Sequence, residues 1–352
     1  MENVCKFFKG RGISKEDLSD TGNPCILYGE LYTTYKTAIA KTIKSKTHLD
    51  LKSLVHSKSN DVLIPCSGET AEDISTSICI PYDDVLIGGD LTIIRSQLNG
   101  AFLSNQINSV RKLDIAKIAQ GKSIVHLQAD ELKKINISFP TIDEQLKIAT
   151  FVDLLDQRID TQSKIIEDLE LFKNRISYQI FFELNGENIV SLGEIASIYQ
   201  PETISQFDFK NDGPFNVYGA NGIIGKYDKY NHEESEILLS CRGNCGTINM
   251  SMPKSWINGN AMVIHVKTAN INKKFMYYYL QNINFKALIS GSGVPQITRK
   301  PVENIKVKIP FKDKQIFITN IMDCIYLKIK KEKDILELYK KQKAYLLKNM
   351  FI

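Results

Sequence analysis

The stretch GSGVPQITRKPVENIKVKIPFKDKQ, residues Gly291–Gln315, repeats a pattern that the chain has already shown in GKSIVHLQADELKKINISFPTIDEQ, residues Gly121–Gln145. Each copy reads as a turn, a short strand, a proline and a helix that opens with glutamine. Pro140 aligns with Pro310 at an offset of 170 residues, and this offset holds without a gap over about forty residues. Chance similarity between two helices rarely keeps one register so long, so we infer an internal duplication.

A heptad seam runs through the helix of each copy. Its positions alternate steps of four and three residues, which is the spacing of a coiled coil. In the first copy the seam positions are Leu155, Ile159, Gln162, Ile166, Leu169, Lys173, Ile176 and Ile180. In the second copy they are Ile325, Ile329, Glu332, Leu336, Tyr339, Lys343, Leu346 and Met350. Both copies interrupt the apolar seam with polar residues at the same two places.

The polar interruptions indicate how the two helices are oriented. In a parallel pair Lys173 would face Lys343, and two like charges would be half-buried together, which is costly. In an antiparallel pair Lys173 meets Glu332, Gln162 meets Lys343, and the other layers are apolar. We therefore predict an antiparallel intramolecular coiled coil. The alternative is a pair of ordinary amphipathic helices, each packed on its own domain.

The charge of the two helical segments favours the coiled coil. Residues 311–352 hold ten lysines against five acidic residues, whereas residues 141–182 hold five basic residues against eight acidic ones. Segments of opposite charge attract each other. At about 1.5 Å of rise per residue, each helix would form a rod of ~60 Å. Such a rod would act as a spacer between the two domains that precede the helices.

The bulk composition is that of a folded cytoplasmic protein. A chain of 352 residues suggests two or three domains, and 43% apolar with 24% charged residues is typical of soluble globular proteins. No apolar run is long enough to span a membrane, and the start MENVCKFFKG lacks the apolar core of a signal peptide. The seven cysteines are an odd, scattered set, so reduced thiols are expected.

The duplication extends more weakly into the segments before the helices. NPCILYG (Asn23–Gly29) resembles GPFNVYG (Gly213–Gly219), and DDVLIGGD (Asp83–Asp90) resembles SEILLSCRG (Ser235–Gly243). Short strands punctuated by Gly, Asn and Pro predict an α+β domain each time. The similar frames and different loops indicate two binding domains that recognise different things.

The predicted organisation has four parts. They are a first domain at residues 1–140, a first helix at 141–182, a second domain at 183–310 and a second helix at 311–352.

Motifs of known catalytic chemistry do not occur. GANGIIGKY (Gly219–Tyr227) has the wrong spacing for a phosphate-binding loop, and Tyr227 stands where Ser or Thr would bind magnesium. Cys241 and Cys245 have no matching Cys or His pair, so no metal site is predicted. The nucleophile elbow, the dinucleotide fingerprint and the tetrapeptides used for amino-group methylation are missing as well. We therefore predict a chain without catalytic residues and without a cofactor of its own.

The remaining candidate functional residues are aromatic and polar residues in predicted loops, close in sequence to basic residues. Arg and Asn read base edges in the major groove, and Lys holds phosphates. The candidate DNA-contacting residues are Tyr28, Tyr32, Thr33, Tyr35, Lys36, Tyr218, Asn221, Lys226, Arg242 and Asn244. For each Tyr the alternative is a packed strand residue, and for Arg242 and Asn244 it is an ordinary surface loop.

Two variable domains, each followed by FPTIDEQ or IPFKDKQ and a long helix, resemble the specificity subunit of type I restriction–modification systems. The stretches GSGVPQIT, YGELYTTY and NPCILYG are also similar to that family, so the resemblance covers essentially the whole chain. It implies two target recognition domains of α/β type in tandem, with the two helices forming the coiled coil. One departure is that the lead-in NIVSLGEIA of the second domain has only its last part in the first. We expect the outer edge of the first domain to be completed from elsewhere.

The resemblance also implies function and partners. Each domain would read one half of a bipartite site on double-stranded DNA, and the coiled coil would set the spacer. Two methyltransferase subunits would dock on the helices and methylate adenine from S-adenosylmethionine. Motor–nuclease subunits would cut DNA with ATP and magnesium, so these cofactors belong to partner subunits. A non-catalytic scaffold with two protein-binding modules is the alternative, and a stand-alone nuclease or a methyltransferase fragment is a further one.

Overall fold

The first long helix, α6 (Ile142–Phe182), is tied at its start to the domain that precedes it. Gln145 is buried, and its side-chain amide donates to the carbonyl of Pro140 at 2.9 Å. Its side-chain oxygen accepts the backbone N–H of Asn99 at 2.9 Å, and Asn99 is the N-cap of α3 (Gly100–Asn108). One buried glutamine therefore joins the beginnings of two helices.

The second long helix, α10 (Lys312–Met350), is held in the same way. The amide of Gln315 donates to the carbonyl of Pro310 at 2.8 Å, and its oxygen accepts the N–H of Asn272 at 2.8 Å. Asn272 is the N-cap of α8 (Lys273–Leu280). The recurring proline-to-glutamine spacing is thus a structural joint, used once in each copy of the duplication.

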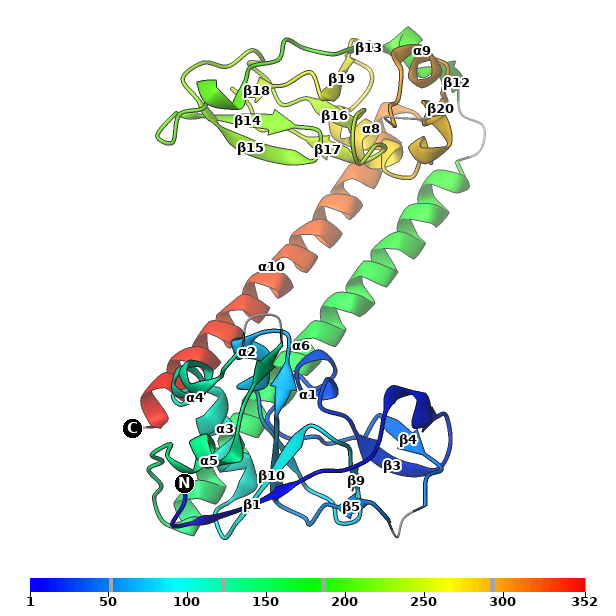
Figure 1. Cartoon of the computed structure of the whole chain (residues 1–352). Helices are drawn as coiled ribbons and strands as arrows, with labels where there is room; N and C mark the ends of the chain where they lie inside the picture. The colour runs from blue at the N-terminus through cyan, green and yellow to red at the C-terminus, as the bar shows by residue number, and fades with distance from the viewer. Residues whose placement is uncertain (51–52, 122–123, 185–187, 292–294, 352) are drawn as a thin grey trace. The chain divides into compact units, whose positions relative to one another are not determined.

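The computed structural model describes residues 1–50, 53–121, 124–184, 188–291 and 295–351, and divides into two compact units (Figure 1). Unit 1 is Met1–Lys164 with Asp334–Ile352, and unit 2 is Ile165–Lys333. Each unit contains one globular part and a portion of each long helix. Residues 122–123 and 292–294, which belong to the two quoted repeats, lie outside the described residues.

Both units are built on the same four-stranded antiparallel sheet. In unit 1 its order is β1 (Cys5–Lys9), β10 (Leu91–Ser96), β6 (Asp61–Pro65) and β8 (Ile78–Ile80). In unit 2 its order is β13 (Ala196–Tyr199), β19 (Ala261–Val266), β16 (Ile237–Ser240) and β17 (Ile248–Met250). Helices α3 and α8 bury Phe102 and Phe275 in the corresponding cores. The duplicated frame that the sequence predicted is therefore present.

The second sheet of each unit differs in size. Unit 1 has five strands in the order β2 (Leu18–Ser19), β4 (Ser45–Thr47), β3 (Asn23–Ile26), β9 (Leu86–Ile87) and β5 (Val55–His56). Unit 2 has three, in the order β15 (Gly222–Tyr227), β14 (Phe215–Gly219) and β18 (Trp256–Ile257). Each sheet contains one parallel pair, β3 with β9 and β14 with β18. The two units therefore share a frame and diverge around it.

Short elements complete both units. In unit 1 they are α1 (Glu30–Thr33), α2 (Ala71–Ile74), α4 (Lys112–Ile118), α5 (Ala129–Lys133), and the strand pair β7 (Ser67–Gly68) and β11 (Val125–His126). In unit 2 they are α7 (Leu192–Ile195), α9 (Arg299–Glu303), and the strand pair β12 (Asn188–Ser191) and β20 (Lys306–Ile309). None of the helices within these described ranges is both long and apolar enough to cross a lipid bilayer.

The strand pairs correct two of the predicted alignments. Leu86 and Ile87 of β9 pair in parallel with β3. In unit 2 the strand that pairs in parallel with β14 contains Trp256 and Ile257. The predicted match of Asp83–Asp90 with Ser235–Gly243 was therefore wrong. Short apolar strands that end in glycine look alike in sequence, and only their partners distinguish them.

The second correction concerns the two tyrosines. Ile26 pairs with Ile87, and Tyr218 pairs with Ile257, so Tyr218 takes the place of Ile26 rather than that of Tyr28. Tyr218 is consequently a core residue, 6% exposed, and its hydroxyl accepts the N–H of Met252 at 3.1 Å.

The long helices lie antiparallel within each unit. In unit 1 Lys343 pairs with Asp156, and the guanidinium of Arg158 lies 4.6 Å from the ring centroid of Tyr339. From Asp156 to Arg158 on α6 the residue numbers rise, while those of their partners on α10 fall from Lys343 to Tyr339, so the two helices run in opposite directions. In unit 2 the ammonium of Lys333 lies 2.8 Å from Glu170, and that of Lys173 lies 5.3 Å from the ring centroid of Tyr326, which gives the same direction. All the seam positions predicted from the heptads are buried or half-buried.

The predicted register of the seam was wrong. Lys343 pairs with Asp156 instead of Gln162, so the helices are displaced by about one heptad. Lys173 pairs with Glu170 of its own helix at 2.6 Å, and Lys328 pairs with Glu332 at 2.5 Å. A lysine stem is long enough to carry its charge out of its own layer, so the polar seam residues need not face each other.

The two seam lysines are equivalent in the duplication but have different partners. The 170-residue offset that relates Lys173 to Lys343 also relates Asp156 to Tyr326. Lys343 therefore makes an ion pair in unit 1 at the position where Lys173 makes a cation–π contact in unit 2. The helices keep the symmetry of the duplication while the chemistry of this layer has diverged.

We expect Lys343→Met to lower the free energy of unfolding by about 2–4 kcal/mol, because it leaves the buried Asp156 carboxylate without its partner. The matched change Lys173→Met should cost less than about 1 kcal/mol, since Lys173 contacts a partly exposed carboxylate and a ring. Denaturant unfolding of both variants measures the difference. Equal losses would contradict the assignment of Lys343 to Asp156.

Burial raises the pKa of the Asp156 carboxyl, although Lys343 acts in the opposite direction. A carboxyl whose pKa is higher in the folded state than in the unfolded state loses stability as the pH rises through the folded value. Lys343→Met should raise that pKa further, so its destabilisation should shrink as the pH is lowered. Unfolding curves at several pH values test this, and Asp156→Asn should remove the effect.

We expect Tyr218→Phe to lower stability by about 0.5–1.5 kcal/mol, because it removes the hydrogen bond to Met252. Tyr28→Phe is the control, since among the described residues the Tyr28 hydroxyl makes no hydrogen bond, and it should change stability by less than about 0.5 kcal/mol. Thermal unfolding of the two variants gives the comparison.

Candidate nucleic-acid interface

Two candidate residues of unit 2 lie on the hairpin formed by β14 and β15. The strands are joined at Ala220 and Asn221, and Gly222 follows with φ +127°, a conformation that favours glycine. Asn221 is exposed at the tip, and Lys226 is exposed on β15 opposite Asn216. Both side chains are therefore available to a ligand outside the sheet.

Arg242 and Asn244 lie on the loop between β16 and β17. The loop turns through Gly243 at φ +74° and Gly246 at φ +96°. Ser240 closes its base, because its hydroxyl donates to the carbonyl of Asn244 at 2.7 Å and its own carbonyl accepts the N–H of Gly246 at 2.9 Å. Both candidate side chains are exposed on this tightly held loop.

The two cysteines of this loop fix it to the domain. The Cys241 thiol donates to the carbonyl of Asn260 at 3.2 Å and accepts from the amide of Gln200 at 3.1 Å. The Cys245 thiol donates to the carbonyl of Pro295 at 3.3 Å. Burial raises the pKa of the Cys241 thiol, so it stays protonated at neutral pH. Across the described ranges no three His, Cys, Asp or Glu side chains gather as metal ligands would.

A further positive charge borders this loop. Lys286 is exposed, and a β-carbon built on Gly246 would lie 3.4 Å from the Lys286 backbone nitrogen and 3.5 Å from its side chain. Lys286 is a neighbour of the loop in space but lies far from it in sequence, which is why sequence patterns did not single it out.

The tyrosines of unit 1 serve mainly in packing. Tyr28 and Tyr35 lie against the core that contains Ile26 and Leu31. The Tyr35 hydroxyl accepts the backbone N–H of Lys44 at 3.4 Å, and burial raises the pKa of Tyr35 to about 12.

The remaining candidates in unit 1 differ in exposure. Tyr32 is half-buried, and its pKa is raised by burial, then by Tyr28 and by the nearby Asp73 and Glu69. Thr33 is exposed and its hydroxyl donates to the carbonyl of Gly29 at 2.8 Å, while Lys36 is exposed beyond the end of α1. Thr33 and Lys36 are thus the accessible candidates of this group.

The structure extends this group with lysines that the motif search missed. Residues 31–47 contain no acidic residue, and Lys44 and Lys46 within them are exposed. The backbone N–H of Lys44 donates to the Tyr35 hydroxyl at 3.4 Å. Lys41 differs because its ammonium lies 2.5 Å from Asp153 on α6. The run without acidic residues was a signal in the sequence, but the contact between Lys44 and Tyr35 depends on the fold of this stretch.

Unit 2 also exposes apolar residues on the long helices. A groove of about 510 Å³ between them is lined by Phe172, Ile176, Ile180, Phe317, Asn320, Ile321, Cys324 and Ile325. Leu171 and Phe317 are 68% and 64% exposed. Exposed apolar side chains in such numbers are typical of surfaces that bind other proteins.

A family model described as the type I restriction modification DNA specificity domain matches the chain twice, at residues 1–171 and 186–339. A putative type I restriction enzyme specificity subunit of Haemophilus influenzae is 30% identical over 117 residues, which is 32% of this chain and 30% of the relative. The putative MjaX specificity subunit of Methanocaldococcus jannaschii is 27% identical over 263 residues, 65% of this chain and 61% of the relative. The matched regions thus span less than two thirds of these relatives.

Solved structures share the fold. The S subunit of a type I restriction–modification system from M. genitalium has a TM-score of 0.67 at 19% identity, covering 100% of this chain and 94% of that one. A chain from a structure concerned with complex assembly and conformational transition of the type I R-M system has a TM-score of 0.61 at 16% identity, with 98% and 95% covered. From the two matches of the family model, the chain belongs to the family of type I restriction modification DNA specificity proteins and carries the specificity domain in tandem.

Proposed function

We propose that this chain is the DNA sequence-recognition subunit of a type I restriction–modification complex. The globular parts, residues 1–140 and 183–310, would each read one half of a bipartite target on double-stranded DNA. One observation carries this proposal: the same four-stranded sheet occurs twice, surrounded by second sheets of five and three strands. A shared frame with different surroundings suits two readers of different half-sites.

The exposed candidates supply the chemistry for reading DNA. In unit 2, Arg242 and Asn244 would contact base edges, because Arg pairs with guanine and Asn with adenine in the major groove. Asn221 at the hairpin tip would add a further polar contact, and Lys226 and Lys286 would hold phosphates. The rigid base of the 240–246 loop favours this role, since a fixed loop loses little entropy on binding.

In unit 1 the corresponding contacts would come from Thr33, Lys36, Lys44 and Lys46. These side chains are exposed, and three of them are lysines in a run without acidic residues. Tyr28, Tyr32 and Tyr35 would hold this stretch in place by packing.

The two long helices would connect the recognition domains and bind the other subunits. Residues 141–182 and 311–352 would set the spacer between the half-sites and dock two methyltransferase subunits. The exposed apolar side chains and the groove between the helices in unit 2 support a docking role.

Catalysis would belong to the partner subunits in the cytoplasm, which would supply S-adenosylmethionine-dependent methylation and, in the motor–nuclease subunits, ATP- and magnesium-dependent cleavage. This chain would contribute specificity alone.

We expect the double variant Arg242→Ala with Asn244→Ala to change one half of the methylated DNA motif and leave the other half intact. The chain would be expressed with its methyltransferase subunit, and methylated adenines would be mapped across the host genome. Removing these two side-chain contacts should weaken binding to that half-site by about 1–3 kcal/mol for each base pair that is no longer read. Recognition of that half should therefore be relaxed or lost.

Arg299→Ala is the matched control for this experiment, because Arg299 is an exposed arginine of the same unit that pairs with Glu303 at 2.6 Å. It should leave the motif unchanged. If the chain conferred no methylated motif at all while binding the methyltransferase subunit, the scaffold alternative would replace the proposal.

A salt titration tests the lysines of unit 1. We expect the triple variant Lys36→Ala, Lys44→Ala and Lys46→Ala to make the slope of log affinity against log salt shallower, by about one for each phosphate that is no longer neutralised. Fluorescence anisotropy of the assembled methyltransferase on target DNA measures the slope. Lys41→Ala is the control, since Lys41 is occupied by Asp153, and an equal change in both variants would argue against phosphate binding at these lysines.

A further inference from the structure

A short row of bridged residues borders the 240–246 loop of unit 2. Arg242 forms a single antiparallel bridge with Gln296, and the N–H of Ile297 donates to the carbonyl of Cys241 at 3.0 Å. Gln296 is also bridged to Ser290, and the two N–H to carbonyl distances are 3.0 and 2.9 Å. We call Arg242, Gln296 and Ser290 the cross-strand row of unit 2.

Unit 1 has an equivalent cross-strand row with different side chains. The 170-residue offset of the duplication relates Gln120 and His126 to residues 290 and 296. Gln120 and His126 bridge each other with N–H to carbonyl distances of 3.0 and 2.7 Å, and His126 pairs with Ser67 of β7. The cross-strand row of unit 1 therefore consists of Ser67, His126 and Gln120.

A further hydrogen bond supports the alignment of the two rows. In unit 1 the N–H of Leu127 donates to the carbonyl of Cys66 at 2.8 Å, in the way that Ile297 donates to Cys241 in unit 2. The residue that follows the cysteine joins the row in each unit, so Ser67 occupies the position of the arginine. The backbone is kept and all three side chains differ, as two readers of different DNA sequences require.

The row of unit 2 presents its side chains on one exposed face. Residues directly opposite each other in an antiparallel pair point to the same face, with β-carbons about 5 Å apart. Arg242, Gln296 and Ser290 are exposed, whereas Cys241 and Ile297, which alternate with them, are buried. Among the described residues, the side chains of Arg242 and Gln296 make no hydrogen bond or ion pair. An arginine and a glutamine therefore stand side by side and are available to a ligand.

Gln296 is held firmly at the centre of this row. Its backbone is bonded to Ser290 on one side and bridged to Arg242 on the other, and the Ser290 hydroxyl also donates to the Gln296 carbonyl at 3.3 Å. The Cys245 thiol donates to the carbonyl of the preceding Pro295 at 3.3 Å, which ties the row to the 240–246 loop. A side chain on a fixed backbone loses little entropy on binding.

The two rows differ in access. A β-carbon built on Gly243 would meet no described atom within 4 Å, whereas one built on Gly68 would lie 2.5 Å from the Ile74 side chain. Ser67 is accordingly only 9% exposed, while His126 remains exposed. The accessible reading position of unit 1 is therefore the one that His126 occupies.

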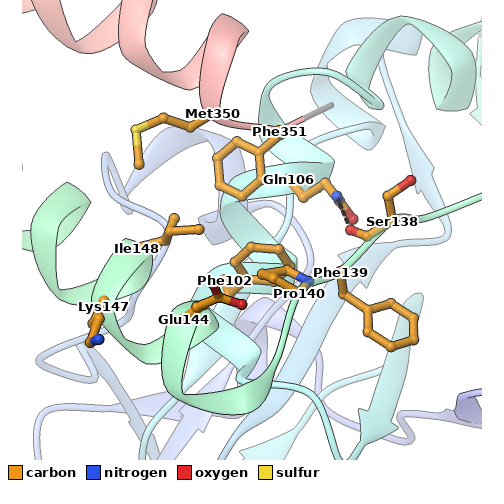
Figure 2. A pocket seen from close by; sticks show the side chains of 10 residues that line it. All are labelled: Phe102, Gln106, Ser138, Phe139, Pro140, Glu144, Lys147, Ile148, Met350 and Phe351. Carbon is orange, nitrogen blue, oxygen red and sulfur yellow. Dashed lines mark hydrogen bonds between the residues drawn. The ribbon is translucent and has the colours of Figure 1, made fainter.

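The apolar cavity of unit 1 is a different surface from this row. The cavity shown in Figure 2 measures about 520 Å³, and Phe102, Ile148 and Phe351 are among its lining residues. The members of the row are not among the described residues that line it. Base edges lie in a groove and are read by side chains that project into it, so the exposed row suits DNA and the cavity does not.

We propose that Gln296 is a specificity-determining residue that reads adenine beside a guanine read by Arg242, an inference that rests on the proposed recognition of DNA by unit 2. Glutamine makes two hydrogen bonds to N6 and N7 of adenine in the major groove, as arginine does to O6 and N7 of guanine. β-carbons about 5 Å apart serve the same or neighbouring base pairs, since about 10 base pairs rise about 34 Å. His126 holds the corresponding place in unit 1 and reads the other half-site.

The test maps methylated adenines in a host that expresses the chain with its methyltransferase subunit. Gln296→Ala should remove the requirement for one A·T base pair, in the half of the motif that Arg242→Ala also changes. Gln296→Glu, which keeps the size of the side chain, should replace adenine by cytosine at that position, because a carboxylate accepts from the cytosine amino group. The control is Gln281→Ala, since Gln281 is an exposed glutamine of unit 2 that accepts the Tyr326 hydroxyl. It should leave the motif unchanged.

The matching change in unit 1 tests the alignment of the rows. His126→Gln should introduce a requirement for adenine in the other half of the motif and leave the half read by unit 2 intact. Fluorescence anisotropy of the assembled methyltransferase, on DNA carrying each of the four bases at the affected position, measures the discrimination even where methylation becomes too weak to map. We expect Gln296→Ala to reduce the preference for adenine by about tenfold or more.

The outcomes separate this inference from the proposed function. If the chain confers a methylated motif that no Gln296 variant changes, the inference is wrong while the proposed function stands. If Gln296→Ala weakens binding to all four DNAs equally, Gln296 contacts DNA without reading it, and the inference is wrong as well. If the unaltered chain confers no methylated motif, the proposed function itself fails. Thermal unfolding of each variant checks that the exposed substitutions leave the fold intact.

Discussion

The fold depends on a buried glutamine that is used twice. Gln145 and Gln315 each receive an N–H from the cap of a helix packed on the main sheet and donate an amide to the proline before a long helix. Both side chains are almost completely buried and are hydrogen-bonded through their oxygen and their nitrogen, so removing one would leave polar groups without partners in the core. This joint orients each long helix against its own domain, and everything further along the helix follows from it.

The far end of each long helix is fixed as well. Phe351 packs on Phe102 with ring centroids 5.2 Å apart, and Phe181 packs on Phe275 at 5.8 Å. Each unit therefore holds the start of one helix and the end of the other, which requires the helices to be antiparallel within it. Because the two ends of each helix are already fixed by the glutamine and phenylalanine contacts, the heptad seam does not have to set the helix direction. The layer that contains the seam lysine could therefore diverge into an ion pair in unit 1 and a cation–π contact in unit 2.

Divergence between the units is concentrated away from the main sheet. The main sheet keeps four strands in the same order in both units, while the second sheet, which shares a core with it through Ile26 and Ile87 in unit 1, has five strands in one unit and three in the other. The candidate DNA contacts lie on the β14–β15 hairpin of the second sheet of unit 2, on the 31–47 stretch of unit 1, and on the 240–246 loop that joins β16 and β17 of the main sheet.

The sequence by itself determined the duplication, the two long helices, their antiparallel direction and the α+β class, because periodicity and a fixed offset are properties of the chain alone. It also placed Arg242 and Asn244 in a glycine-rich loop. Only the tertiary structure decided the register of the seam, the burial of Tyr218, the pairing of β9 and β18 with their partners, and the nearness of Lys286 to the 240–246 loop. A heptad pattern repeats every seven residues and so fits several registers, and short apolar strands resemble one another until their partners are known. These features depend on contacts between residues far apart in the chain, which local patterns do not encode.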